Sequence, residues 1–144
     1  MTNNSNAAAG RGNPQDKIIL IASDDETLWE LLYYIVHKEG FPVEKADSHS
    51  EAMDKARALR PALILLALNP HDSYATLREL QTDDTVSIPV ILLANRPIDR
   101  ATEELIRQEP NVKGFLQQPA DALNLAALLH KLLNTCPPVK KKSE

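Results

Sequence analysis

Short apolar runs alternate with stretches of helical periodicity over most of the chain. Five of these runs are too short for a helix. The first, third and fourth are almost wholly apolar, as expected for strands buried on both faces of a parallel sheet. The predicted strands cover residues 17–22, 41–46, 63–68, 89–94 and 112–117.

The segment after each strand carries apolar residues at offsets of three and four, the spacing of a helix with one buried face. A capping box from Ser48 to Glu51 opens the second helix, and Asp99 caps the fourth, which carries Leu105 and Ile106. The first helix ends at Gly40, and its predicted core stripe comprises Leu28, Leu31, Leu32, Ile35 and Val36. The third and fifth helices are predicted at 74–80 and 121–133.

Five strands that alternate with five helices predict a doubly wound α/β fold, because each right-handed crossover returns over a parallel sheet. We expect the flavodoxin-like strand order 2-1-3-4-5, which puts the wholly apolar runs at central places. A chain of 144 residues fits one domain, predicted at 17–134. The Asn-, Ala-, Gly- and Pro-containing segment 1–16 is expected to be a disordered leader, and 135–144 a basic flexible tail.

Composition excludes several classes of function. The formal net charge of −4 argues against nucleic acid as the main partner. A single cysteine, Cys136, allows no internal disulfide and favours a reducing, cytoplasmic location. No apolar run approaches the roughly 20 residues that span a bilayer, so no membrane association is expected.

Ligands of such sheets bind beyond the carboxyl ends of the strands. The residues at these ends form a sparse set for catalysis, without a histidine, a lysine or a glycine-rich phosphate loop, so no enzyme activity and no cofactor are predicted. Asp24 and Asp25 are interpreted as caps of the first helix, and Asp72 as a cap of the third. The four histidines have no zinc-site spacing and are expected on the surface, so no metal site is predicted.

Four stretches carry a resemblance to a known family: KIILIASDDETLWELL, RPALILLALNP, IPVILLA and GFLQQPAD. Over residues 17 to about 133 the chain resembles the receiver domain of bacterial two-component response regulators. In that family an acidic pair after the first strand holds Mg²⁺ and an aspartate ending the third strand accepts a phosphoryl group. A Thr or Ser ends the fourth strand, and a Lys follows the fifth.

The resemblance implies a degenerate phosphorylation site. The acidic pair falls on Ser23 and Asp24, and the phosphoacceptor position falls on Ala67. The hydroxyl position falls on Ala94 and the lysine position on Gln118. Phe115 stands at the position of the switch aromatic residue. Since alanine offers no oxygen nucleophile and one carboxylate is a poor Mg²⁺ site, we expect a pseudo-receiver.

The leading interpretation is a phosphorylation-independent signalling or scaffold module that acts through a protein partner. An alternative is a small-molecule or cofactor-sensing domain, with the ligand in the cleft near Gln117, Gln118, Asn69 and Asn95.

Three side chains lie off the predicted core stripes and are candidates for partner binding: Trp29, Tyr33 and Leu123. Trp and Tyr are enriched at binding hot spots. The alternative is that these rings pack against neighbouring side chains of the same chain. A homodimer is compatible with the resemblance, although the sequence selects no helical face for it.

Overall fold

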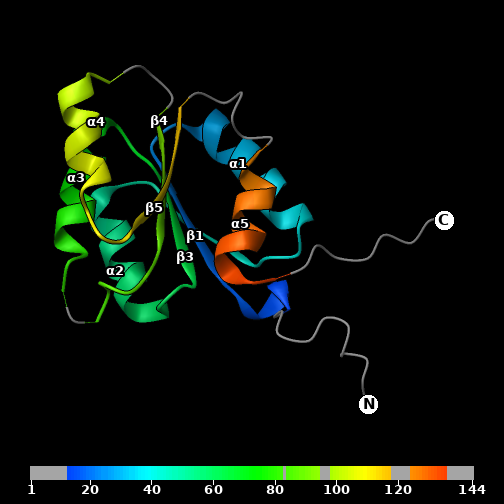
Figure 1. The fold of residues 1–144 in the computed structure, drawn as a ribbon. Coiled ribbons are helices and arrows are strands. Elements are labelled where there is room, and N and C mark those ends of the chain that lie inside the picture. Colours follow the sequence, from blue (N-terminus) through cyan, green and yellow to red (C-terminus); the bar gives the residue numbers. More distant parts are fainter. Residues whose placement is uncertain (1–12, 83, 95–97, 118–123, 136–144) are drawn as a thin grey trace, which may run out of the picture.

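A computed structural model describes residues 13–82, 84–94, 98–117 and 124–135. Its centre is a five-stranded parallel sheet in the order β2-β1-β3-β4-β5, which confirms the predicted doubly wound topology (Figure 1). The strands are β1 (Ile19–Ser23), β2 (Val43–Ala46), β3 (Leu63–Ala67), β4 (Val90–Ala94) and β5 (Val112–Gln117).

Helices cover both faces of this sheet. In Figure 1, α1 and α5 lie on one face, and α2, α3 and α4 lie on the other. The helices are α1 (Glu26–Lys38), α2 (His49–Leu59), α3 (Pro70–Glu79), α4 (Arg100–Arg107) and α5 (Leu125–Leu133).

Alternate side chains of the central strands pack into two hydrophobic cores, one on each face of the sheet. In β1, Ile19 and Ile21 pack into the core under α1 and α5, whereas Leu20 packs into the core under the other three helices. The same alternation holds in β3 and β4. Because every side chain of these three strands is buried, their sequences are apolar throughout, apart from Ser23 at the end of β1, and do not alternate.

Side-chain caps begin four of the helices. Asp25, Ser48 and Asp99 each accept a hydrogen bond from a backbone N–H in the first turn of α1, α2 and α4, as predicted. The predicted cap of α3 is wrong: Asn69 caps that helix, and its Oδ1 accepts from the N–H of Asp72 at 2.9 Å. The helix starts at Pro70, earlier than predicted, because proline suits the first turn, where its missing N–H costs nothing.

Two leucines, one in α1 and one in α4, are exposed: Leu31, which was assigned to the core stripe of the first helix, and Leu105 of the fourth. Leu31 of α1 is 39% exposed and Leu105 of α4 is 49% exposed. In α4 only Ile106 is buried, and in α1 the buried arc runs through Leu28, Leu32 and Val36 without reaching Leu31. Each helix therefore buries a narrower stripe than its apolar content suggests.

Regular structure begins before the predicted domain boundary at residue 17. Pro14–Asp16 form a short 3-10 turn, capped by the Asn13 side chain, and Pro14 is buried. Among the described helices, none is both long and apolar enough to cross a membrane.

Candidate functional site

Three strands end side by side at the edge of the sheet where the site was predicted. Parallel pairing places Ser23, the last residue of β1, next to Ala67, the last residue of β3. Ala94 ends the neighbouring strand β4. All three side chains are buried, with 2%, 3% and 7% exposure respectively. The structure therefore brings together the positions to which the family resemblance assigned the metal, the phosphoacceptor and the hydroxyl group.

Ser23 uses its hydroxyl group locally. Its Oγ accepts from the backbone N–H of Asp25 at 3.2 Å and lies 3.2 Å from the Asp25 carbonyl, to which it donates. These bonds close the turn between β1 and α1. The Ser23 hydroxyl group is thus committed to the backbone.

Asp24 does not cap α1, contrary to the prediction, but bonds across the site. Its Oδ2 accepts from the backbone N–H of Asn69 at 3.3 Å and from the Asn69 side-chain Nδ2 at 3.4 Å. The same Nδ2 donates to Asp72 Oδ2 at 3.0 Å. One amide group therefore bridges two carboxylates, one from the β1–α1 turn and one from the first turn of α3.

This arrangement is a poor fit for the divalent cation that the family resemblance implies. Mg²⁺ demands a near-octahedral set of oxygen ligands and gives up its water reluctantly. Ala67 supplies no side-chain oxygen, and the Asn69 amide donates to the Asp24 carboxylate that would have to face the ion. Within the described residues, no group of three or more His, Cys, Asp or Glu side chains is arranged to hold a metal.

The described part of this edge also offers little room for a small organic ligand. A cavity between β3, β4, α3 and α4 has a volume of only about 10 Å³, enough for about one water molecule. Its lining is mostly apolar and consists of Leu68, Pro70, Ser73, Leu92, Leu93, Ala94, Ile98 and Ile106. The predicted alternative of a ligand-sensing cleft gains no support from these residues.

The aromatic position of β5 carries a half-buried ring. The guanidinium group of Arg107 lies 4.8 Å from the centroid of Phe115, which couples the end of α4 to the strand through a cation–π contact. Gln118, assigned to the lysine position, lies outside the described residues, as do Asn95 and the candidate contact residue Leu123.

An aromatic row runs along α1. The rings of Trp29 and Tyr33 stack with centroids 5.1 Å apart, and the imidazole of His37 stacks on Tyr33 at the same distance. Tyr33 is 36% exposed, and Trp29 is partly buried, in agreement with the prediction that both lie beside the core stripe. Tyr34, which was not among the predicted contact residues, is 64% exposed.

One histidine predicted on the surface is buried. His130 of α5 is 8% exposed, and its Nε2 lies 3.0 Å from Glu39 Oε1 at the end of α1. Its Nδ1 lies 2.7 Å from the Thr135 hydroxyl group. Polar partners on both ring nitrogens make burial tolerable, and a pairing across 91 positions leaves no local signal in the sequence.

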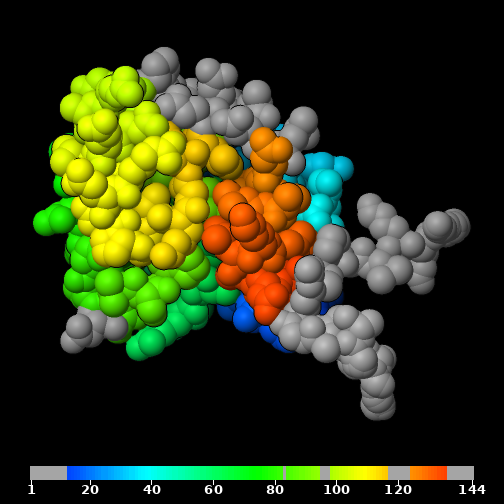
Figure 2. All heavy atoms as spheres, in the orientation of Figure 1, coloured from blue at the N-terminus to red at the C-terminus, as the bar shows by residue number. Residues whose placement is uncertain are grey.

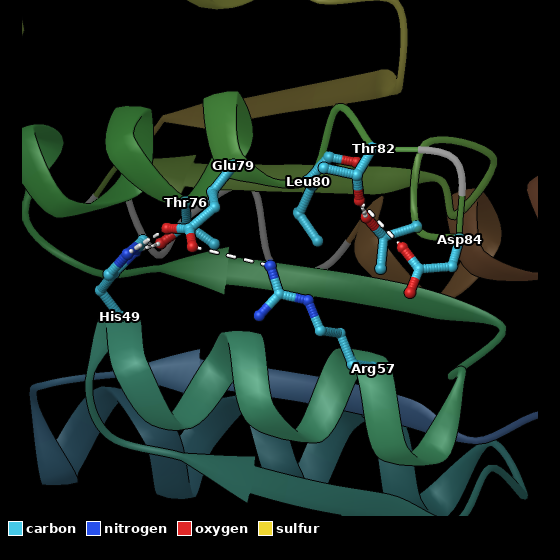
Figure 3. A network of polar contacts seen from close by, with 8 residues as sticks. His49, Arg57, Thr76, Glu79, Leu80, Thr82 and Asp84 are labelled. Carbon is cyan, nitrogen blue, oxygen red and sulfur yellow. Dashed lines mark hydrogen bonds and ion pairs between the residues drawn. The ribbon is translucent and has the colours of Figure 1, made fainter.

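A second histidine joins α2 to α3 (Figure 3). His49 Nδ1 lies 2.8 Å from Thr76 Oγ1, and its Nε2 lies 2.8 Å from Glu79 Oε1. The other carboxylate oxygen of Glu79, Oε2, lies 3.6 Å from the Arg57 guanidinium group. The arrangement has the residue types of a nucleophile, base and acid triad. However, Thr76 is buried and donates its hydroxyl proton to the Asp72 carbonyl, so we interpret the cluster as a joint between helices.

The sheet order, the helix placement and the position of the polar site define the receiver class of α/β domains. Comparisons with individual proteins and with solved structures agree with this class, although one comparison found no match. No protein-family model matches the chain. The protein PilH of Pseudomonas aeruginosa is 25% identical over 118 residues, which cover 80% of this chain and 96% of PilH.

Solved structures give the same result. The signal receiver domain of a signal transduction histidine kinase from Syntrophus aciditrophicus is 27% identical, with a TM-score of 0.72 over 88% of this chain and 98% of that one. A CheY-like receiver domain from Methanospirillum hungatei is 19% identical and shares the fold, with a TM-score of 0.69 over 81% and 93% of the two chains. The chain thus has the receiver fold and is similar in sequence and structure to response-regulator receiver (CheY-like) domains.

Proposed function

We propose that this receiver domain works without phosphorylation and transmits signals through protein contacts in a two-component-type pathway. The observation that carries the proposal is Ala67 at the buried end of β3, paired in register with Ser23. An aspartyl phosphate needs a carboxylate nucleophile at that place and a cation to neutralise the incoming phosphoryl oxygens. Neither residue supplies a carboxylate.

The bridge made by Asn69 supports the same proposal. Its Nδ2 contacts Asp24 Oδ2 at 3.4 Å and Asp72 Oδ2 at 3.0 Å, so a neutral donor sits between the two acids. The two loops are thereby held together by an amide rather than by a metal ion. Because the Asn69 amide group bonds to both carboxylates, we expect this site to bind neither Mg²⁺ nor a phosphoryl donor.

Intact-mass spectrometry after incubation with acetyl phosphate and Mg²⁺ tests the proposal. We expect no gain of a phosphoryl group, while a receiver that retains its aspartate, treated in the same way, is labelled. Millimolar Mg²⁺ should also leave the melting temperature unchanged, since only a bound ion stabilises the folded state.

Two variants localise any unexpected signal. Stoichiometric, acid-labile label on the wild type that disappears in Asp72→Asn would make Asp72, in the first turn of α3, the phosphoacceptor and refute the proposal. A Mg²⁺-dependent rise in melting temperature that disappears in Asp24→Asn would show that the metal site survives, with the same consequence.

A further inference from the structure

Helix α1 exposes a stripe of three residues spaced by one helical turn: Glu30, Tyr34 and Lys38. Residues at i, i+4 and i+8 lie on one face of a helix. The buried residues of α1 occupy the opposite side, so this stripe points to solvent. At its centre, Tyr34 is the most exposed large hydrophobic side chain among the described residues, at 64%.

A preformed aromatic wall flanks this stripe. The stacked rings of Trp29, Tyr33 and His37 run parallel to it, one position earlier in the sequence at each turn. The Lys45 ammonium group lies 4.6 Å from the centre of Trp29 and 2.9 Å from Glu26, which fastens the row to β2. Stacked rings lose little conformational freedom when they bind, so the surface is already organised for contact.

Three of the six Trp, Tyr and Phe residues of the chain therefore lie on or beside one exposed helix face. Leu31, 39% exposed, extends this face on its other side. In Figure 2 the cyan atoms of the region that includes α1 reach the surface at the edge of the molecule, beside the orange atoms of α5. Such a cluster of exposed rings is typical of a protein-binding surface.

The charges of the stripe identify the occupant. Along the helix the stripe consists of an acid (Glu30), an aromatic residue (Tyr34) and a base (Lys38). When an identical stripe runs antiparallel to it, the acid of each copy faces the base of the other. We propose that α1 is a homodimer interface, in which a second copy of this chain packs its α1 antiparallel across a two-fold axis beside Tyr34. Glu30 then faces the partner's Lys38, Lys38 faces the partner's Glu30, and the two Tyr34 rings meet at the axis.

A two-fold interface has to be self-complementary, which this stripe is. By contrast, the exposed Leu105 on α4 is surrounded by charges already paired within its own helix, Arg107 with Glu103 at 2.9 Å and Arg100 with Glu104 at 3.8 Å. On α1, the partner of Lys38 among the described residues is the adjacent Glu39, at 3.5 Å. The α1 charges are therefore better placed for a contact between molecules.

The size of the contact predicts its strength. A helix of 13 residues is about 20 Å long, so one helix pair lies at the small end of specific interfaces. We expect a dimer that dissociates in the micromolar range. A homodimer would supply the protein partner of the proposed function. Its part in signalling rests on that proposed function, whereas the interface itself does not. Phosphoryl labelling and self-association are measured separately, so either can fail alone.

Sedimentation velocity of the full chain over a range of concentrations tests the interface. The wild type should dimerise, and Tyr34→Ala should weaken the dimer by about tenfold or more. Glu30→Lys and Lys38→Glu should each be monomeric at concentrations where the wild type is dimeric, because each places two like-charged pairs across the axis.

Charge exchange makes the test specific. An equimolar mixture of Glu30→Lys chains and Lys38→Glu chains should form heterodimers, visible by native mass spectrometry, because both contacts across the interface are then between a lysine and a glutamate again. The double variant Glu30→Lys/Lys38→Glu should dimerise by itself. Since these side chains are exposed, circular dichroism is expected to show an unchanged fold, and Leu105→Ala is the control for association through α4.

Three results would overturn the inference: a wild type that stays monomeric throughout the micromolar range, single charge reversals that leave the dimer intact, or a mixture of the two reversals without heterodimers. Dissociation by Leu105→Ala with no effect of Tyr34→Ala would place the interface on α4 instead.

Discussion

At the scale of single residues, the candidate site at the carboxyl ends of the strands is defined by the absence of carboxylates from Ser23, Ala67 and Ala94. Ser23, Ala67 and Ala94 occupy adjacent buried positions, and the Ser23 hydroxyl group is bonded to the backbone of its own turn. These identities could be read from the sequence once the strands were placed. The role of Asn69 could not, because an asparagine before a proline indicates a helix cap without revealing that its Nδ2 reaches Asp24 from 45 positions away.

Restoring an acid at the end of β3 is expected to destabilise the protein. In Ala67→Asp a carboxylate would enter a position that is 3% exposed, at a cost of roughly 2 kcal/mol in the free energy of unfolding. The loss should shrink as the pH falls and the new carboxyl group becomes protonated. Urea unfolding measures it, with Ala67→Asn as the uncharged control of the same size as aspartate. Full stability at neutral pH would show that the site accommodates an anion, against our account.

At the scale of elements, local signals located the helix starts well. Ser48 accepts from the N–H of Glu51 at 3.1 Å, as the capping box predicted. The return bond differs slightly from the usual box, because Glu51 Oε1 accepts from the N–H of Asp47 at 2.9 Å. Periodicity was less reliable for helix faces: Leu31 and Leu105 are exposed because burial depends on how each helix sits on the sheet.

The Glu51 bond predicts a pH-dependent contribution to stability. The Asp47 N–H, aided by Lys55, holds the pKa of Glu51 below its ordinary value of 4.5. A pKa lowered by folding favours the charged form in the folded state. The contribution is therefore complete above the unfolded value and is lost as the pH falls through the folded value.

Glu51→Ala should accordingly lower the free energy of unfolding at pH 7 by a few tenths to about 1 kcal/mol, and by less at pH 3. Chemical unfolding of both proteins at the two pH values measures the difference. An equal deficit at both would mean that helix propensity or packing, rather than the charged bond, accounts for the effect.

At the scale of the whole molecule, polar pairs join elements that are distant in sequence. His130 and Glu39 connect the ends of α5 and α1 in a largely buried setting, with side chains 9% and 14% exposed. His49 and Glu79 connect α2 and α3 in a more open setting, 30% and 47% exposed. The two pairs have the same chemistry and differ in burial.

A double-mutant cycle should reveal this difference. We expect His130→Ala and Glu39→Ala to be non-additive by about 1 kcal/mol or more, because removing either partner leaves the other poorly solvated. The matched cycle with His49→Ala and Glu79→Ala should give a smaller coupling, a few tenths of a kcal/mol, since exposed pairs are weak. Thermal or urea unfolding of each variant supplies the values. Equal couplings would contradict the importance of burial.

The sequence by itself determined the order of strands and helices, the doubly wound sheet and the residues at its carboxyl edge. These follow from local periodicity, from caps and from the handedness of crossovers, all of which act over short stretches of chain. Only the tertiary structure decided that Asn69 bridges two acids and that His130 is buried against Glu39. Such contacts join segments far apart in the sequence, and no local pattern encodes the distance between them.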